Sequence, residues 1–282
     1  MEKYQLIERS IITTYRKKIW APFIKALKMY QLLEPNDKVL VCMSGGKDSF
    51  LLAKLMEELH KHSDFPFSYI CLVMDPGYKE EIRSQIEANL KLLNVNATIV
   101  KSDIFEIADL MGGKPCFLCA RMRRGFLYKQ AEKLGCNKIA LGHHFDDAIE
   151  TLLMGMFYNG KIQTMPPKLV SDNYKGLELI RPLYLVHEQD IINWVKYNDL
   201  SFIRCACKFS DSNYNYDSKR QEVKNIIKNL KKINPIIPNN IFEAMGNINL
   251  DTMLGYSINR KHQGFNELYE KRKKACLNEP SV

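Results

Sequence analysis

Short apolar runs alternate with helical patterns along the first 160 residues, and this alternation constrains the fold more than any other feature. We assign strands to residues 38–43, 67–74, 97–100 and 138–141, and helices to residues 51–60, 79–93, 121–134 and 146–157. Strands separated by helices form βαβ units, in which the strands are parallel and helices cover both faces of the sheet. We therefore predict an α/β fold with a doubly wound parallel sheet.

Changes in composition divide the chain into three parts. Residues 1–34 have helical spacing and form an N-terminal helical segment, and residues 35–210 form the main α/β domain. Residues 211–282 form a basic helical C-terminal extension, whose polar tail after Asn259 we expect to be frayed. The sequence thus predicts one main α/β domain, with a helical segment before it and another after it.

Composition and charge indicate the cellular compartment and the class of binding partner. No apolar run approaches the roughly 20 residues that span a bilayer, and the first residues are too polar for a signal peptide, so we expect a cytoplasmic protein without membrane contact. The eight cysteines then favour metal binding or redox chemistry over structural disulfides. With 41 basic and 32 acidic residues, the net charge of +9 is typical of a protein that binds a polyanion.

A glycine-rich loop follows the first predicted strand directly. It reads Ser44-Gly45-Gly46-Lys47-Asp48-Ser49. Two glycines let the backbone approach an anion closely, and the next helix offers unpaired N–H groups and the positive end of its dipole. The spacing differs from that of a Walker A loop. We predict a phosphate-binding loop; a tight turn that needs glycine only for its geometry is the alternative.

Other polar residues also follow predicted strands. Asp75 ends the second strand, and Gly142, His143, Asp146 and Asp147 follow the fourth. Ligands of open α/β sheets gather at the carboxyl ends of the strands. Asp146 is a candidate N-cap for the next helix. A metal site built from the histidines and aspartates is an alternative interpretation.

A cysteine pair lies between the third and fourth strands. Cys116 and Cys119 are spaced as C-x-x-C and precede the basic residues Arg121, Arg123 and Arg124. Such a pair chelates a soft metal or acts as a redox dithiol, and a structural zinc site needs further ligands. The only other cysteine cluster is Cys205-Ala206-Cys207.

Taken together in this order, the motifs resemble those of the tRNA 2-thiocytidine synthetase family, a branch of the N-type ATP pyrophosphatases, the PP-loop superfamily. The resemblance covers about residues 32–227. It depends on the glycine loop, the cysteine pair with its arginines, Gly142 to Asp147, Met165 to Lys168, Arg181 to Leu183 and a late cysteine. It implies a Rossmann-like fold of the adenine nucleotide alpha-hydrolase type, with residues 35–210 as the ATP pyrophosphatase domain.

The resemblance also implies the nucleotide site. Residues 44–49 would hold the phosphates of ATP, with Lys47 and Asp48 in catalytic roles and Asp48 also as a ligand of Mg²⁺. The adenosine side would be formed by Asp75, Gly142, His143 and Asp147.

For the cysteines, the resemblance implies a [4Fe–4S] cluster held by three thiolates, which leaves one iron open to hydrosulfide. Cys116 and Cys119 match the family pair. Relatives usually carry C-x-x-C at the third position, whereas this chain has two cysteines one residue apart. We assign Cys205 as the third ligand and keep Cys207 as the alternative.

The implied activity is ATP-dependent thiolation of tRNA. The C2 oxygen of an anticodon-loop cytidine, position 32, would be adenylated and replaced by sulfur to give 2-thiocytidine. A cysteine desulfurase or free sulfide would supply the sulfur, and a homodimer is among the options for assembly. The predicted tRNA contacts are Arg121, Arg123, Arg124, Lys168 and Arg181.

Two other functions stay open. The first is an ATP-dependent ligase or sulfur transferase of the PP-loop type that acts on another tRNA base or a small molecule, with zinc or a redox dithiol at the cysteines. The second is a non-catalytic RNA-binding module that has kept a nucleotide-binding fold.

Overall fold

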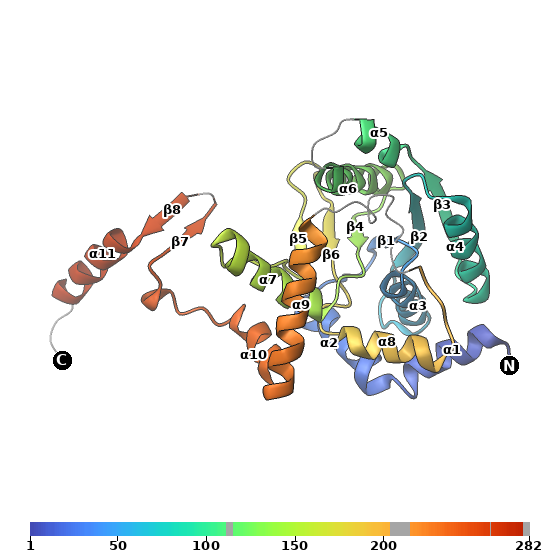
Figure 1. Cartoon of the computed structure of the whole chain (residues 1–282), viewed down its shortest axis with the longest axis horizontal. Helices are drawn as coiled ribbons and strands as arrows, with labels where there is room; N and C mark the ends of the chain where they lie inside the picture. Colours follow the sequence, from blue (N-terminus) through green and yellow to red (C-terminus); the bar gives the residue numbers. More distant parts are fainter. Residues whose placement is uncertain (111–114, 204–214, 260, 279–282) are drawn as a thin grey trace. The chain divides into compact units, whose positions relative to one another are not determined.

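The computed structural model describes residues 1–110, 115–203, 215–259 and 261–278, and the chain divides into two compact units (Figure 1). Unit 1 runs from Met1 to Asn229 and unit 2 from Leu230 to Val282. In the described part of the chain, no helix is long and apolar enough to span a membrane.

Unit 1 is built on a six-stranded sheet with the order β3-β2-β1-β4-β6-β5. The strands are β1 (Lys38–Met43), β2 (Ser68–Asp75), β3 (Ala97–Lys101), β4 (Lys138–Ala140), β5 (Lys168–Val170) and β6 (Glu178–Ile180). All neighbours pair in parallel except β5, which is antiparallel to β6. The predicted doubly wound parallel sheet is confirmed, and the short strands β5 and β6 are additions that the sequence analysis missed.

Helices cover both faces of this sheet (Figure 1). They are α1 (Lys3–Ile12), the π-helix η1 (Arg16–Trp20), α2 (Ala21–Met29), α3 (Lys47–His62), α4 (Glu80–Leu92), α5 (Ile104–Leu110), α6 (Pro115–Lys133), α7 (Phe145–Asn159), α8 (Glu188–Tyr197) and α9 (Asn215–Ile233). Successive side chains of β1 point to opposite faces, so Val39 and Val41 enter one core while Leu40 and Cys42 enter the other. The uninterrupted apolar run of β1 follows from this burial on both faces.

The N-terminal helices belong to the first of these two cores. Ile7, Ile19 and Phe23 are fully or almost fully buried there, together with residues of β1 and α3. Trp194 of α8 is also buried, and its indole N–H donates to the Ser10 hydroxyl at 3.2 Å. The segment before β1 is therefore part of the packing that supports the sheet.

Unit 2 contains the end of α9, a short helix, a hairpin and a final helix. Its elements are α10 (Ile237–Ala244), the 3-10 helix η2 (Leu250–Thr252), β7 (Gly255–Ile258), β8 (Lys261–Gly264) and α11 (Phe265–Asn278), and β7 and β8 are antiparallel. The expectation of a frayed tail after Asn259 is wrong for residues 261–278, because a hairpin strand and a helix order them.

Candidate active site

The glycine loop joins β1 to α3 and depends on glycine at one position in particular. Gly45 has a φ of +85°, and a Cβ atom there would lie 2.7 Å from Ile203 and 2.8 Å from Ile86. The positive φ favours glycine here, because a side chain would be strained, and the two isoleucine side chains would also have to shift to make room for it. Gly46 is the N-cap of α3, so the first N–H groups of this helix are free to bind an anion.

A second loop, which follows β4, packs against the first. A Cβ atom on Gly142 would lie 3.2 Å from the carbonyl carbon of Asp48 and 3.3 Å from the amide nitrogen of Ser49. Strands β1 and β4 are neighbours, and the chain winds away from them in opposite directions. The two loops thus meet at the switch point of the sheet, where ligands of doubly wound folds bind.

A cavity of about 280 Å³ opens between these loops and α6. Its lining includes Ser44, Asp48, Ser49, Tyr78, Arg123, Leu127, Gly142, His143 and Asp147. This volume is close to the lower end of the range for small-molecule sites. Backbone amides, a carboxylate and a guanidinium thus face one space of a size suited to part of a nucleotide.

Lys47 and Asp48 form the charged centre of the phosphate loop. The Lys47 ammonium lies 3.1 Å from Asp48 Oδ2 and 3.0 Å from Glu188 Oε1. Burial lowers the pKa of Lys47, but Asp48 and Glu188 outweigh it and raise the pKa, so the ammonium stays charged. Asp48 Oδ1 is buried and has no hydrogen-bond partner. An unpartnered carboxylate oxygen beside a phosphate loop fits a Mg²⁺ ion, which prefers oxygen ligands and shares them with substrate phosphates.

Glu188, which the sequence analysis missed, holds Lys47 from the first turn of α8. Burial raises the pKa of Glu188, but Lys47, Lys224 and His144 lower it more strongly, to about 2. The carboxylate is therefore ionised at any physiological pH. Its backbone N–H donates to Asp146 Oδ2 at 2.7 Å, so the loop after β4 also fixes the start of α8.

Helix α9, at the C-terminal end of unit 1, adds two cations to the cluster of Lys47, Asp48 and Glu188. Lys224 lies 3.2 Å from Glu188 and 3.6 Å from Glu150, and Arg220 Nε lies 3.5 Å from Glu150. Glu150 is only 2% exposed, and its Oε2 has no hydrogen-bond partner. Burial is the main cause that raises the pKa of Glu150 to about 7. A chain of charges therefore connects α9 to the phosphate loop.

The histidines after β4 serve the helix and the cavity rather than a metal. His144 is the N-cap of α7 and exchanges hydrogen bonds with Asp147, at 3.1 and 3.4 Å. The prediction that Asp146 is the N-cap is wrong, because His144 occupies that position and Asp146 accepts from Glu188 instead. Burial lowers the pKa of His143 to about 4, so its ring is neutral. Among the residues that the structure describes, no three His, Cys, Asp or Glu side chains are arranged to hold a metal ion.

Asp75 shapes the opposite wall of the cavity without lining it. The carboxylate is 3% exposed and accepts hydrogen bonds from the backbone N–H groups of Gly77 and Tyr78, at 2.9 and 2.7 Å. This turn carries Tyr78 into the cavity, where its hydroxyl donates to the Ser44 carbonyl at 3.4 Å. Asp75 thus positions a residue that links β2 to the phosphate loop.

The cysteine pair lies on α6, which begins at Pro115, six residues before the helix that the sequence predicts. The Cys119 thiol is 5% exposed and close to Tyr78: burial raises the pKa of this phenol, and Cys119 adds to the increase. A buried thiol beside the cavity fits a soft metal cluster. The side chain of Cys116, and both Cys205 and Cys207, lie outside the described residues.

The three arginines of α6 do not share one environment. Arg121 and Arg124 are exposed. Arg123 lines the cavity, where its guanidinium donates to the Tyr78 hydroxyl at 3.4 Å and lies 5.5 Å from the centre of the Phe105 ring. Arg123 is therefore placed for a ligand of the cavity, and the other two for a partner on the surface.

Lys168 and Arg181 each contact a backbone carbonyl. Arg181 is 8% exposed and donates to the Pro166 carbonyl, and burial lowers its pKa. Lys168 Nζ donates to the Gln31 carbonyl at 3.1 Å. Lys168 thus joins β5 to the segment after α2, and Arg181 joins the end of β6 to the segment before β5.

Comparison with known proteins identifies the family. The model of the PP-loop domain family matches residues 18–230. Over 240 residues the chain is 39% identical to the tRNA-cytidine(32) 2-sulfurtransferase of Coxiella burnetii (strain CbuG_Q212), an alignment that covers 83% of this chain and 91% of the relative. The chain belongs to the tRNA-cytidine(32) 2-sulfurtransferase family.

A second relative agrees with this placement, and one solved structure shares the fold. The 2-sulfurtransferase of Neisseria meningitidis serogroup C (strain ATCC 700532) is 36% identical over 229 residues, or 79% of this chain and 69% of the relative. The fold is similar to that of the U34-tRNA thiolase NcsA from Methanococcus maripaludis, solved with its [4Fe–4S] cluster, with a TM-score of 0.63 and 23% identity over 80% of this chain and 76% of that one. The resemblance inferred from the motifs is confirmed.

In this 2-sulfurtransferase family member, the structure gathers most of the sequence-predicted nucleotide residues. Ser44, Asp48, Ser49, Gly142, His143 and Asp147 line one cavity, with Lys47 at its edge. Glu188, Glu150, Arg220 and Lys224 join them but were not predicted. Their only local signal is an acidic or basic residue on a helix, which is too common to identify a site.

Proposed function

We propose that this protein is an ATP-dependent tRNA sulfurtransferase that converts cytidine 32 of the anticodon loop to 2-thiocytidine. The observation that carries the proposal is one cavity with the phosphate loop on one side and helix α6, which bears Cys119 and Arg123, on the other. Its membership of the 2-sulfurtransferase family supports the same assignment.

The phosphate loop binds and orients the nucleotide. The first N–H groups of α3 and the Lys47 ammonium face the phosphates of ATP, and Asp48 Oδ1 is a ligand for the Mg²⁺ that accompanies them. Glu188 keeps Lys47 charged and limits its rotation. Interactions of this kind stabilise the charge that develops on the phosphates during transfer.

In the first step, the C2 oxygen of cytidine attacks the α-phosphorus of ATP and pyrophosphate leaves. The base then carries AMP on this oxygen, which has become a good leaving group. In the second step, hydrosulfide forms the C2–S bond, its proton goes to solvent, and AMP leaves with the oxygen. The hydrosulfide comes from free sulfide, or from the persulfide of a cysteine desulfurase after a thiol reductant has released it. The pyrophosphate and AMP released account for all atoms of the ATP consumed.

The cysteines would hold a [4Fe–4S] cluster that, when bound, offers one open iron for hydrosulfide. We assign Cys116, Cys119 and Cys205 as its ligands, with Cys207 as the alternative to Cys205. The burial of Cys119 beside Tyr78 and the cavity supports its place in this set.

The test is reconstitution with purified protein, an unmodified tRNA transcript, ATP, Mg²⁺ and sulfide under anaerobic conditions. Mass spectrometry of the digested nucleosides should detect 2-thiocytidine, and a transcript with uridine at position 32 should give none. Lys47→Ala should lower the yield of 2-thiocytidine by a factor on the order of 10², whereas Lys91→Ala, which removes an exposed lysine at the end of α4, should leave it unchanged.

The two rival functions predict other outcomes. A ligase with zinc at the cysteines would be colourless, would contain zinc and would leave the tRNA nucleosides unchanged. A non-catalytic RNA-binding module would bind tRNA without releasing pyrophosphate from ATP. Either result with the wild-type protein would replace the proposed function.

A further inference from the structure

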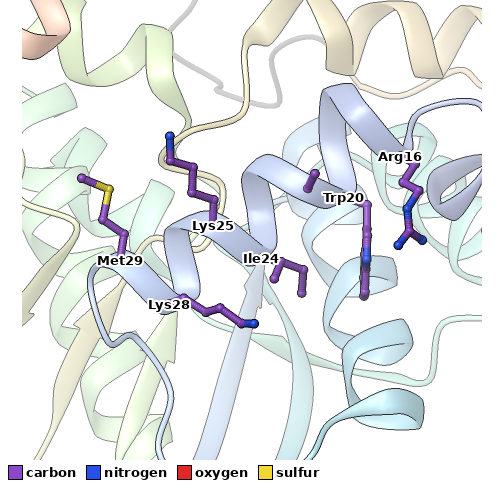
Figure 2. A pocket seen from close by; sticks show the side chains of 7 residues that line it. Arg16, Trp20, Ile24, Lys25, Lys28 and Met29 are labelled. Carbon is purple, nitrogen blue, oxygen red and sulfur yellow. The ribbon is translucent and has the colours of Figure 1, made fainter.

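A shallow hollow of about 620 Å³ lies on the N-terminal helices η1 and α2, outside the candidate active site (Figure 2). Its lining includes Arg16, Trp20, Ile24, Lys25, Lys28 and Met29. Figure 2 shows the Trp20 ring and Ile24 between Arg16 on one side and Lys25 and Lys28 on the other. We name this set the N-terminal basic surface.

The helices η1 and α2 that form this surface carry cations and no acidic residue. Residues 9–33 include Arg9, Arg16, Lys17, Lys18, Lys25 and Lys28, and no aspartate or glutamate. In the described ranges, Lys18 pairs with Asp190 at 3.7 Å, while no ion pair joins Arg16, Lys25 or Lys28 to an acidic side chain. Glu34 and Asp64 line a neighbouring hollow that shares Trp20, Ile24 and Lys28, but η1 and α2 themselves carry charge of one sign only. Exposed helices usually mix the two signs, so this cluster of cations indicates a negatively charged partner.

The position of the surface relates it to the candidate active site. Asp190, which pairs with Lys18, is two residues after Glu188, which holds Lys47 of the phosphate loop. At the other end, the carbonyl of Gln31 accepts a hydrogen bond from Lys168. The segment that carries the basic surface is therefore held at one end by α8, beside Glu188, and at the other end by β5.

We propose that the N-terminal basic surface binds tRNA, with Arg16, Lys25 and Lys28 on backbone phosphates and Trp20 against a base or ribose. Phosphates attract cations of this kind, and an aromatic ring stacks on unpaired nucleotides without regard to sequence. This inference rests on the proposed function, because it takes tRNA as the substrate, but it concerns a surface that the chemistry does not use.

A membrane is the other partner that basic, aromatic helices bind, and the packing argues against it. A membrane-surface helix needs a free apolar face. Here Ile19, Phe23 and Leu27 are 0–8% exposed and belong to the core beneath the sheet. The apolar side chains left in the hollow are Trp20, Ile24 and Met29, and the first two are themselves partly buried against this core, so little apolar surface is free to insert into a bilayer.

The experiment measures the affinity of an unmodified tRNA transcript over a range of KCl concentrations. The double variant Lys25→Ala/Lys28→Ala should lower the slope of log affinity against log salt by about 1 for each lysine. The matched control is Lys91→Ala/Lys133→Ala, which removes two exposed lysines near the ends of α4 and α6, outside the N-terminal basic surface. The control should keep the wild-type slope.

Trp20 gives an independent readout, because the chain has only two tryptophans and the other, Trp194, is fully buried. tRNA should quench the fluorescence of the wild-type protein, and Trp20→Phe should abolish this quenching. Both Lys25/Lys28 and Trp20 variants should bind an ATP analogue as the wild type does, which verifies that the phosphate loop is intact.

An unchanged slope in Lys25→Ala/Lys28→Ala, or an equal decrease in the control, would overturn the inference. So would lysine-dependent binding to vesicles containing phosphatidylglycerol together with lysine-independent binding to tRNA. Failure of the wild type to form 2-thiocytidine would instead count against the proposed function, and the salt slopes would still decide whether this surface binds RNA.

Discussion

Replacing Glu150 with glutamine should stabilise the protein at pH 8 and have little effect near pH 4.5. The Glu150 carboxyl is 2% exposed, and its Oε2 makes no hydrogen bond although Arg220 and Lys224 are nearby. Burial outweighs the attraction of these two cations and raises the pKa of Glu150 from the ordinary 4.5 to about 7. The folded protein therefore favours the neutral acid, which glutamine mimics in shape.

The magnitude follows from the difference between the two pKa values. Below pH 4.5 the carboxyl of Glu150 is protonated in both the folded and the unfolded chain, and its titration costs nothing. Between pH 4.5 and about 7 the Glu150 carboxyl loses its proton only in the unfolded chain. The free energy of unfolding therefore falls by about 1.4 kcal/mol per pH unit. Above pH 7 the loss is constant at roughly 3 kcal/mol, and Glu150→Gln should recover most of it.

Urea unfolding at pH 4.5, 6 and 8, followed by circular dichroism, measures the free energy of unfolding directly. Glu178→Gln is the matched control, since the hydrogen bond from Lys138, at 2.7 Å, lowers the pKa of Glu178. Its charged form stabilises the fold above the ordinary pKa, and this contribution is lost as the pH falls. The control should therefore be destabilised at pH 8. If Glu150→Gln were also destabilised at pH 8, the ion pairs of Glu150 would be stronger than its burial, and the reasoning would be refuted.

Three further predictions concern the site. Lys47→Ala should lower ATP-dependent thiolation by a factor on the order of 10², because a charge that faces the phosphates is lost; unchanged turnover would contradict this role, and a normal urea midpoint would exclude misfolding. Cys119→Ala should lose iron after anaerobic reconstitution, while Cys136→Ala, another buried thiol, should keep it, as iron analysis will show. Arg123→Ala should weaken binding of an ATP analogue, since Arg123 lines the cavity, whereas exposed Arg124→Ala should instead lower the salt slope of tRNA binding by about 1. Identical effects of these two arginine variants would show that they share one partner.

Local sequence signals were sufficient to predict the inner strands of the sheet, but not the short strands β5 and β6. The apolar runs of β1 and β2 are buried on both faces, and the glycines after β1 have a backbone reason to be there. In contrast, β5 and β6 have three residues each, too few for a pattern of alternation. β6 pairs with β4 and β5 pairs with β6, so both strands depend on partners that only the assembled sheet provides.

The same distinction applies to the site. The phosphate loop could be predicted because its residues are consecutive, whereas the pairing of Lys47 with Glu188 joins two helices that are distant in the sequence. Lys224 reads as one more cation on a basic helix until the fold places it 3.2 Å from Glu188. The environment of Arg123 could not be predicted for a related reason, since its partner Tyr78 lies 45 residues earlier in the chain and meets α6 only in the folded protein.

The close approach of Gly142 to Asp48 has a consequence for how this enzyme family can change. A methyl group at position 142 would press on the peptide between Asp48 and Ser49, so the residue allowed in one loop is decided by the course of another. The two loops must therefore be inherited, or transplanted into another scaffold, as a pair. A graft of the glycine loop alone would transfer its residues without the loop after β4, against which they pack.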